Sequence, residues 1–288
     1  MNYVLILINY FPEYIKHVIN SILSVDKDSK VILCHNSKTQ INIHNVISVN
    51  LEDLNSDLLD EFNNLNIFKD SIYEENQLWK TSLQRIFYLN EVIQQLDLSN
   101  VIHFDNDVII YKPFSDLESS IQKEKINITP YNLNKFTFGY SYIKDKSLAS
   151  RLSDETIKFY KEGKKSDWDF NNGKPLNEME ALKSISLNNP TLFHLLPTLP
   201  YQNNIIFDPA GYGQYIDGTH GNPKKAFQRG YTSNNDPIGV EITSKRMTVK
   251  FKSEPTVNWE GKKFTIANLH VHSKRLDKFL PPNYIKYV

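Results

Sequence analysis

Short apolar runs alternate with amphipathic segments over residues 1–110, and this alternation limits the fold more strongly than any other feature of the sequence. The runs have the length and the continuous apolar character of strands that are buried on both faces. Between them, residues 12–24 and 75–96 place apolar side chains three or four positions apart, which is the spacing of an amphipathic helix. Strands alternating with helices predict an α/β fold with a mostly parallel central sheet that helices cover on both sides. The expected strands are residues 3–8, 30–35, 45–50 and 100–104.

The remainder of the chain has a less regular pattern. Glycine, asparagine, proline and aspartate dominate residues 203–236, which predicts a long loop; a short strand, residues 203–208, is expected at its start and ends in Asp208. The tail, residues 264–279, has the pattern of one strand followed by a cationic turn. Because the sequence contains neither an internal repeat nor a clear linker, we expect a single domain over residues 1–288 with a loop-rich C-terminal region. The other elements expected here are strands at 125–131 and 135–143 and helices at 147–163 and 177–189.

Charge and cysteine content restrict the possible partners. Lysine and arginine together number 33, as do aspartate and glutamate, so the chain offers no broad positive field for nucleic acid or anionic lipid. Any anionic ligand is therefore expected to be held locally. Cys34 is the single cysteine and lies in an apolar run, which predicts a buried thiol and a reducing compartment. The opening segment has neither the apolar length of a membrane span nor a basic leader, which favours a cytoplasmic protein without a transmembrane segment.

Two aspartates, Asp105 and Asp107, stand one residue apart at the end of the expected strand 100–104. In open, mostly parallel sheets, ligands bind at the carboxyl edge of the strands, where these side chains should lie. A simple turn is one interpretation, since aspartate and asparagine are common turn formers. However, apolar runs flank the pair on both sides, where uncompensated charges are costly, and this favours chelation of a hard divalent cation. Val108, which follows the pair, does not fit an EF-hand loop.

The segment "NVIHFDNDVIIYKPFSDL", residues 100–117, resembles the D-x-D segment of glycosyltransferases with the GT-A fold. The order of parts also resembles bacterial and viral glycosyltransferases of surface polysaccharides across nearly the whole chain. The resemblance implies that Asp105 and Asp107 coordinate Mn²⁺ or Mg²⁺, which bridges the diphosphate of a nucleotide-sugar donor. It further implies a donor-binding half, residues 1–130, and an acceptor-binding half, residues 131–288, which ends in a metal and diphosphate tail.

The same resemblance assigns donor-binding roles by position. The loop "INYFPEY" after the first strand corresponds to the part of GT-A enzymes that holds the base and ribose, which makes Asn9 and Tyr10 candidates. Tyr10 could instead pack on the following helix. Arg85, on the helix before the motif, corresponds to a cation that faces the donor phosphates, although a solvated helix arginine is equally compatible with the sequence. Asn106, between the two aspartates, is a further candidate, and Gln214 in "GYGQY" could contact the sugar or the acceptor.

The tail "NLHVHSK" supplies further candidates. Strand alternation places His270 and His272 on one face, and many GT-A enzymes carry a histidine metal ligand near the C-terminus, with a lysine soon after it on the diphosphate. Lys274 fits the second role. A packed polar pair of histidines is the alternative, and the sequence leaves open which imidazole would bind metal.

Transfer to an acceptor hydroxyl by inversion requires a general base. Glu178 at the start of the expected helix 177–189 is the candidate, with Glu180 beside it, although acidic residues in a first helical turn are also ordinary capping residues. Asp208 is the competing carboxylate, and a retaining mechanism needs no such base. Four aromatic residues of the loop region are compatible with an acceptor cleft: Tyr201, Phe207, Tyr212 and Tyr215.

The overall expectation is a metal-dependent glycosyltransferase that uses a nucleotide sugar, with UDP- or GDP-sugars favoured, and a glycan acceptor. Peripheral attachment to a membrane is the alternative location. A nucleotidyltransferase also uses paired acids and metal, but residues 7–14 lack the glycine-rich loop that normally cradles phosphates in that class. A non-catalytic carbohydrate-binding protein is the third possibility, and the aspartate and histidine pairs argue against it.

Overall fold

The computed structural model describes residues 1–38, 44–54, 56–69, 71, 73–162, 175–201, 204–220 and 236–288. Its centre is a seven-stranded sheet with the order β3-β2-β1-β4-β7-β6-β8. The pairs β3-β2, β2-β1, β1-β4 and β6-β8 are parallel, whereas β7 runs antiparallel to both of its neighbours. The expected α/β class with a mostly parallel central sheet is confirmed. The strands are β1 (Asn2–Leu7), β2 (Lys30–His35), β3 (Val46–Asn50), β4 (Val101–His103), β6 (Ile126–Asn132), β7 (Lys135–Ile143) and β8 (Phe193–Leu195).

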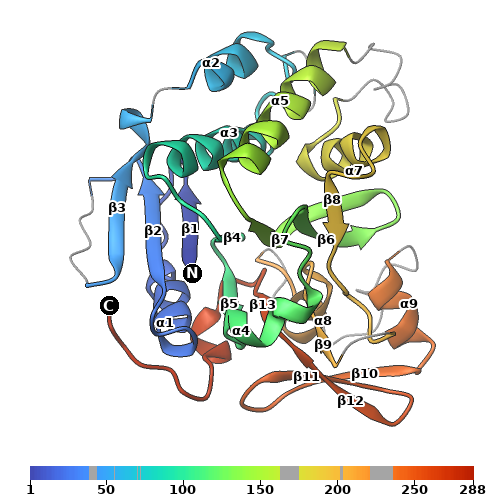
Figure 1. Cartoon of the computed structure of the whole chain (residues 1–288). Helices are drawn as coiled ribbons and strands as arrows, with labels where there is room; N and C mark the ends of the chain where they lie inside the picture. Colours follow the sequence, from blue (N-terminus) through green and yellow to red (C-terminus); the bar gives the residue numbers. More distant parts are fainter. Residues whose placement is uncertain are drawn as a thin grey trace.

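Helices cover both faces of this sheet. Along β1, Tyr3, Leu5 and Leu7 pack into the same apolar cluster as helix α1, which spans Ile15–Val25. The alternate residues, Val4 and Ile6, pack into a second cluster with the remaining large helices. Figure 1 shows these helices gathered on the side away from α1. They are α2 (Asp57–Asn64), α3 (Gln77–Gln95), α5 (Lys146–Glu162) and α7 (Glu178–Asn188).

The C-terminal region differs from the expected loop. A second sheet has the order β10-β11-β12-β9. Two short helices, α8 and α9, belong to the same region of the chain. β9 lies within the short strand expected at 203–208, whereas α8 occupies a part of the chain that was expected to be irregular. Residues 221–235 of the expected loop lie outside the described residues. A two-residue strand and a helix with two glycines give little periodicity, and tertiary contacts decide their structure. The elements are β9 (Ile205–Ile206), α8 (Gly211–Asp217), α9 (Pro237–Thr243), β10 (Met247–Phe251), β11 (Pro255–Trp259) and β12 (Lys262–Ile266).

The tail is two strands in two different sheets, and not the single strand that was expected. β12 ends at Ile266, and β13 (Asn268–His270) pairs antiparallel with β5 (Val108–Ile110). Because β5 directly follows the acidic turn, this pairing brings the tail to the carboxyl edge of β4. Figure 1 shows β5 and β13 side by side below β4. The short helix α4 (Phe114–Leu117) and the 3-10 turns η1 (Leu51–Asp53), η2 (Glu118–Ser120) and η4 (Leu276–Phe279) complete the described elements.

Two smaller expectations concern burial and membranes. Cys34 is fully buried in β2, and burial raises the pKa of its thiol, so the predicted core role is confirmed. Within the described ranges, every helix is too short or too polar to cross a bilayer.

Candidate metal and donor site

The acidic turn after β4 lies at the carboxyl edge of the central sheet, as the sequence predicts. β4 occupies the middle of the sheet, between β1 and β7. Asp107 is almost completely buried, and Asp105 is partly exposed. The chain then returns as β5, whose partner β13 carries His270 opposite Val108.

Asp107 is the point where the turn and the tail meet. One oxygen of its carboxylate lies 2.9 Å from His270 Nε2, and the other accepts a hydrogen bond from the Lys274 ammonium. Burial raises the pKa of Asp107, but His270 and Lys274 lower it by more, so the carboxyl is held below its usual range. Burial also lowers the pKa of His270, and Asp107 and Asp105 overcome this effect and raise it. The turn and the tail therefore form one charged network.

His272 adds a second imidazole to this network. The ring centroids of His270 and His272 are 4.3 Å apart, although β13 ends at His270 and strand alternation does not extend to His272. Within the part of the chain that the structure describes, the buried Nδ1 of His270 and Nε2 of His272 have no hydrogen-bond partner. Burial, followed by repulsion from His270, lowers the pKa of His272 to about 4, which keeps this imidazole neutral near pH 7. A neutral imidazole is the form that binds metal.

The residues present fit a divalent cation. Asp107, His270 and His272 each offer one ligand atom, and these atoms all lie within 4.8 Å of one another. Unpartnered buried ring nitrogens beside a buried carboxylate are costly unless something binds them. Carboxylate and imidazole are both ordinary protein ligands of divalent metal ions. Asp105 contributes less directly, because its second oxygen lies 3.7 Å from His270 Nε2.

Arg85 lines the cavity, and two acidic side chains already engage its guanidinium. Its guanidinium lies between two carboxylates: it pairs with Asp105, and its Nη2 donates to Glu178 Oε1 at 2.8 Å. The same guanidinium carbon lies 5.5 Å from the centroid of the Phe138 ring. Burial holds the pKa of Asp105 up, but Arg85 and then His270 lower it to about 2. Arg85 thus fixes two acidic side chains that come from different elements.

Glu178 is the first residue of α7 and lines the same site. Asn177 caps this helix by accepting from the backbone N–H of Met179 and Glu180, and Glu180 completes the capping box. Glu178 is therefore not needed as a capping residue. Burial raises the pKa of Glu178 to about 7, against the opposing effect of Arg85. A carboxylate that titrates near neutral pH can accept a proton from a substrate hydroxyl.

Asp208 does not have the environment of a general base. It is fully buried, and its carboxylate accepts four backbone N–H hydrogen bonds. Ala210 and Tyr212 donate to Oδ1 at 2.9 Å each, while Gly213 and His270 donate to Oδ2 at 2.9 and 3.0 Å. These donors occupy both oxygens, so the geometry gives Asp208 a structural role and does not support the expected catalytic one.

A cavity of about 710 Å³ opens in front of the acidic turn. Its lining includes apolar residues from the end of β1, the loop after it and the first turn of α3, among them Tyr10, Leu78 and Trp79. Residues of β6, β7 and α7, including Tyr131 and Lys135, also line it. Ten of the predicted site residues line the cavity: Tyr10, Arg85, Asp105, Asn106, Asp107, Glu178, Gln214, His270, His272 and Lys274.

Two predicted residues and all four aromatic candidates, Tyr201, Phe207, Tyr212 and Tyr215, lie outside the cavity lining. Asn9 and Asp208 are absent from the cavity lining. Asn9 has a φ of 58° and exchanges hydrogen bonds with Asn36, whose side chain accepts from the Asn9 backbone at 2.9 Å and donates to its side chain at 2.7 Å. Phe207 and Tyr212 are fully buried core residues, so they cannot form an acceptor cleft.

Sequence inspection missed several residues of the site. Tyr14 donates to Asn106 Oδ1 at 3.2 Å, and its ring lies 5.8 Å from Lys274 Nζ. Asp217 and Arg275 form an ion pair next to the tail. The cationic residues after His272 were visible in the sequence. No local pattern indicated that Asp217, the last residue of α8, would pair with one of them.

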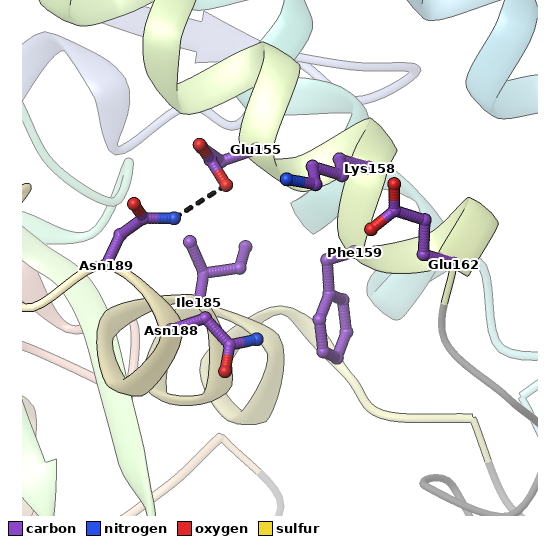
Figure 2. A pocket seen from close by; sticks show the side chains of 7 residues that line it. All are labelled: Glu155, Lys158, Phe159, Glu162, Ile185, Asn188 and Asn189. Atoms are coloured by element: carbon purple, nitrogen blue, oxygen red, sulfur yellow. Dashed lines mark hydrogen bonds between the residues drawn. The ribbon is translucent and has the colours of Figure 1, made fainter.

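A second cavity, of about 430 Å³, lies between α5 and α7. Figure 2 shows its lining, in which Glu155 accepts a hydrogen bond from Asn189 at 2.7 Å across the opening. None of the predicted site residues borders it. Its other lining residues are Lys158, Phe159, Glu162, Ile185 and Asn188.

Comparison with known proteins gives matches among solved structures only. No protein-family model and no curated protein matches the chain. Mouse xyloside xylosyltransferase 1 is 12% identical with a TM-score of 0.47, over 68% of this chain and 86% of that one. The galactosyltransferase LgtC, solved with donor and acceptor sugar analogues, is 14% identical with a TM-score of 0.44, over 69% and 74%. GlyE from Streptococcus pneumoniae TIGR4 is 12% identical with a TM-score of 0.41, over 80% and 52%. All three are glycosyltransferases by name.

Proposed function

We propose that this protein is a metal-dependent glycosyltransferase that moves a sugar from a nucleotide diphosphate donor to a hydroxyl acceptor. One observation carries the proposal: Asp107, His270, His272 and Lys274 converge on the carboxyl edge of a mostly parallel sheet, at the floor of the large cavity. A carboxylate and two imidazoles can hold Mn²⁺ or Mg²⁺, and the adjacent ammonium can bind the oxygens of a diphosphate.

The metal supplies electrostatic stabilisation of the leaving diphosphate. Asp107, His270 and His272 are the residues that would hold it, with Asp105 beside them. Lys274 adds a positive charge on the same side of the cavity, since its ammonium already contacts Asp107. Together these groups favour departure of the nucleoside diphosphate, which carries away the electron pair of the broken bond between sugar and phosphate oxygen.

The cavity lining suits both ends of a nucleotide sugar. Tyr10, which exposes 61% of its surface, lines the cavity together with Leu78 and Trp79, and these side chains offer apolar surface for a base. Glu178 lines the same cavity together with Lys135 and Met179, and we place the acceptor there. In an inverting reaction Glu178 takes the proton of the acceptor hydroxyl, whose oxygen forms the new bond to the anomeric carbon. A UDP- or GDP-sugar donor and a glycan acceptor are the partners that we favour.

Titration calorimetry with UDP-, GDP- and dTDP-sugars, each with and without Mn²⁺ or Mg²⁺, tests this proposal. We expect one nucleotide to bind only when the metal is present, with Mn²⁺ more effective than Mg²⁺. Product analysis should then show a free nucleoside diphosphate. Release of pyrophosphate would indicate nucleotidyl transfer, and binding of free glycans without any nucleotide would indicate a carbohydrate-binding protein; either result would refute the proposal.

A further inference from the structure

The segment that carries His270, His272 and Lys274 is held from one side by the short helix α8. Figure 1 places α8 next to β13, and the two elements are in contact. A buried aspartate stands at each end of this helical region: Asp208 precedes it, and Asp217 is its last residue. Each of them binds a different part of the tail.

The first anchor fixes His270. Asp208 Oδ2 accepts the backbone N–H of His270 at 3.0 Å and that of Gly213 at 2.9 Å, so one oxygen ties the strand to the helix. The two backbones are very close at this point, since a Cβ added to Gly213 would lie 1.9 Å from the carbonyl oxygen of His270. The position of His270 is therefore set by α8 as well as by β5.

The second anchor binds the residues on either side of Lys274. Asp217 Oδ2 accepts hydrogen bonds from the Ser273 hydroxyl and from Arg275 Nε, the latter at 2.9 Å. The other Asp217 oxygen pairs with an Nη of Arg275, which completes a bidentate ion pair. The Asp217 side chain is only 9% exposed, compared with 32% for Arg275, so solvent weakens this pair less than it would a surface pair.

Lys274 lies between these two anchored residues in a backbone conformation that needs support. Its φ is 64°, in the left-handed region that non-glycine residues rarely adopt. Its backbone N–H donates to the Val271 carbonyl at 2.9 Å, which closes a tight turn and directs the side chain toward Asp107. A lysine is a flexible point charge, so the direction of its stem depends on how firmly the backbone is held.

We propose that Asp217 is a positioning residue that fixes Lys274 over the cavity by holding Ser273 and Arg275. The functional part of this inference rests on the proposed role of Lys274 in binding a nucleoside diphosphate. Asp217 itself does not line the cavity and makes no contact with Asp107 in the described structure. Its effect on ligands must therefore pass through Lys274.

The claim that Asp217 positions Lys274 can be tested by NMR in the absence of any ligand. Reductive methylation with ¹³C-formaldehyde gives each lysine an NMR signal, and the signal that is absent in Lys274→Arg identifies Lys274. In the wild type we expect a shifted and broadened signal from the contact with Asp107. In Asp217→Asn the negative charge is lost and the amide nitrogen cannot accept from the Arg275 Nη, so the bidentate pair is broken and the Lys274 signal should move toward those of exposed lysines. A Lys274 signal unchanged in Asp217→Asn would overturn the inference, whether or not the protein binds nucleotides.

A double-mutant cycle tests the functional part. The Kd of the nucleoside diphosphate is measured at saturating Mn²⁺ for the wild type, Asp217→Asn, Lys274→Ala and the double variant. We expect Asp217→Asn to weaken binding about tenfold, as loss of a supporting contact commonly does. In the Lys274→Ala background the same substitution should change the Kd by less than about twofold, since the charge it positions is gone. Equal losses in both backgrounds would show a general structural role and contradict the proposal.

Milder variants guard against loss of folding. Arg275→Lys keeps the charge but removes the bidentate fork, and it should shift the Lys274 signal in the same direction by a smaller amount. Arg246→Lys is the matched control, because Arg246 also pairs with a buried carboxylate: one Nη lies 2.7 Å from a Glu241 oxygen, and neither residue belongs to the tail. We expect Arg246→Lys to leave both the Lys274 signal and the Kd unchanged. If wild-type protein binds no nucleoside diphosphate at all, the proposed function fails, and the NMR result alone then decides whether Asp217 positions Lys274.

Discussion

His270 Nε2 lies 2.9 Å from a carboxylate oxygen of Asp107, and this contact joins the turn after β4 to the end of β13. The two residues come from opposite halves of the chain and meet because β13 pairs with β5. A carboxylate and an imidazole at this distance can share a proton or a metal ion. The site that we propose for nucleotide-sugar chemistry depends on this junction.

We expect Asp107→Asn to abolish metal binding and sugar transfer while the protein still folds. The amide keeps the shape of the side chain and removes the charge that faces His270 and Lys274. Calorimetric titration with Mn²⁺ measures the loss, and circular dichroism checks the fold. Asp97→Asn is the control, since Asp97 is an exposed carboxylate paired with Lys146 at 2.7 Å. Normal Mn²⁺ affinity in Asp107→Asn would remove the basis of the proposed function.

Glu178→Gln should lower kcat by about 10²- to 10⁴-fold if Glu178 is the general base. Burial raises the pKa of Glu178 to about 7, and a base must be ionised to act, so wild-type kcat should fall as the pH drops below about 7. The variant should lack this acidic limb. Glu180→Gln is a matched control, because glutamine preserves the capping box of α7. An unchanged pH profile in Glu178→Gln would favour a retaining mechanism without this base.

Tyr10→Ala should weaken nucleotide-sugar binding by about 1–3 kcal/mol, the usual loss when a stacked base loses its aromatic partner. The side chain is largely exposed, so the thermal unfolding temperature should stay the same. Tyr201→Ala serves for comparison, since Tyr201 is similarly exposed at 58% but does not line the cavity. Equal donor affinity in the wild type and Tyr10→Ala, measured by calorimetry, would place the base elsewhere.

Gly213→Ala should destabilise the protein by about 1–3 kcal/mol and weaken Mn²⁺ binding at the same time. The added methyl would lie 1.9 Å from the His270 carbonyl oxygen, so α8 and the tail must separate. Gly211→Ala tests the same helix more gently, because its methyl meets the tip of the flexible Ile238 side chain at 2.8 Å. Urea unfolding and metal titration of both variants provide the comparison. Similar behaviour of the two variants would argue against close packing at Gly213.

His103 should make the stability of the protein depend on pH. Its Nδ1 lies 2.8 Å from the Val4 carbonyl, and burial, with Arg85 nearby, lowers its pKa from 6.5 to about 3. Below pH 6.5 the unfolded state therefore binds a proton that the folded state excludes. The contribution of neutral His103 to the free energy of unfolding is complete above pH 6.5. It is lost as the pH falls toward 3, by at most about 1.4 kcal/mol per pH unit.

Urea unfolding at several pH values compares the wild type with His103→Asn, which keeps a short donor toward Val4. The free energy of unfolding of the variant should fall less steeply between pH 6.5 and 3. Parallel curves for the two proteins would mean that another group causes the acid sensitivity.

The sequence by itself determined the elements with strong periodicity. Strand β1 and helices α1 and α3 follow from the apolar spacing of their own residues, and these local patterns were sufficient to predict a mostly parallel sheet. The placement of Asp105 and Asp107 at the carboxyl edge followed as well, because a residue after a parallel strand has only one edge on which to lie. Helix α8, within the expected loop, could not be predicted, since a short helix with two glycines carries no helical pattern of its own.

Only the tertiary structure decided which charged groups meet. In the sequence, Asp208 and Glu178 are competing candidates for the general base. In the structure, four backbone N–H groups donate to Asp208, whereas Glu178 pairs with Arg85 and lines the cavity. Likewise, nothing near Arg275 indicates that its partner is Asp217. The periodicity of side chains within a segment shows which face of that helix or strand is buried. Which distant segments then meet depends on how the elements pack, and no short stretch of sequence contains that information.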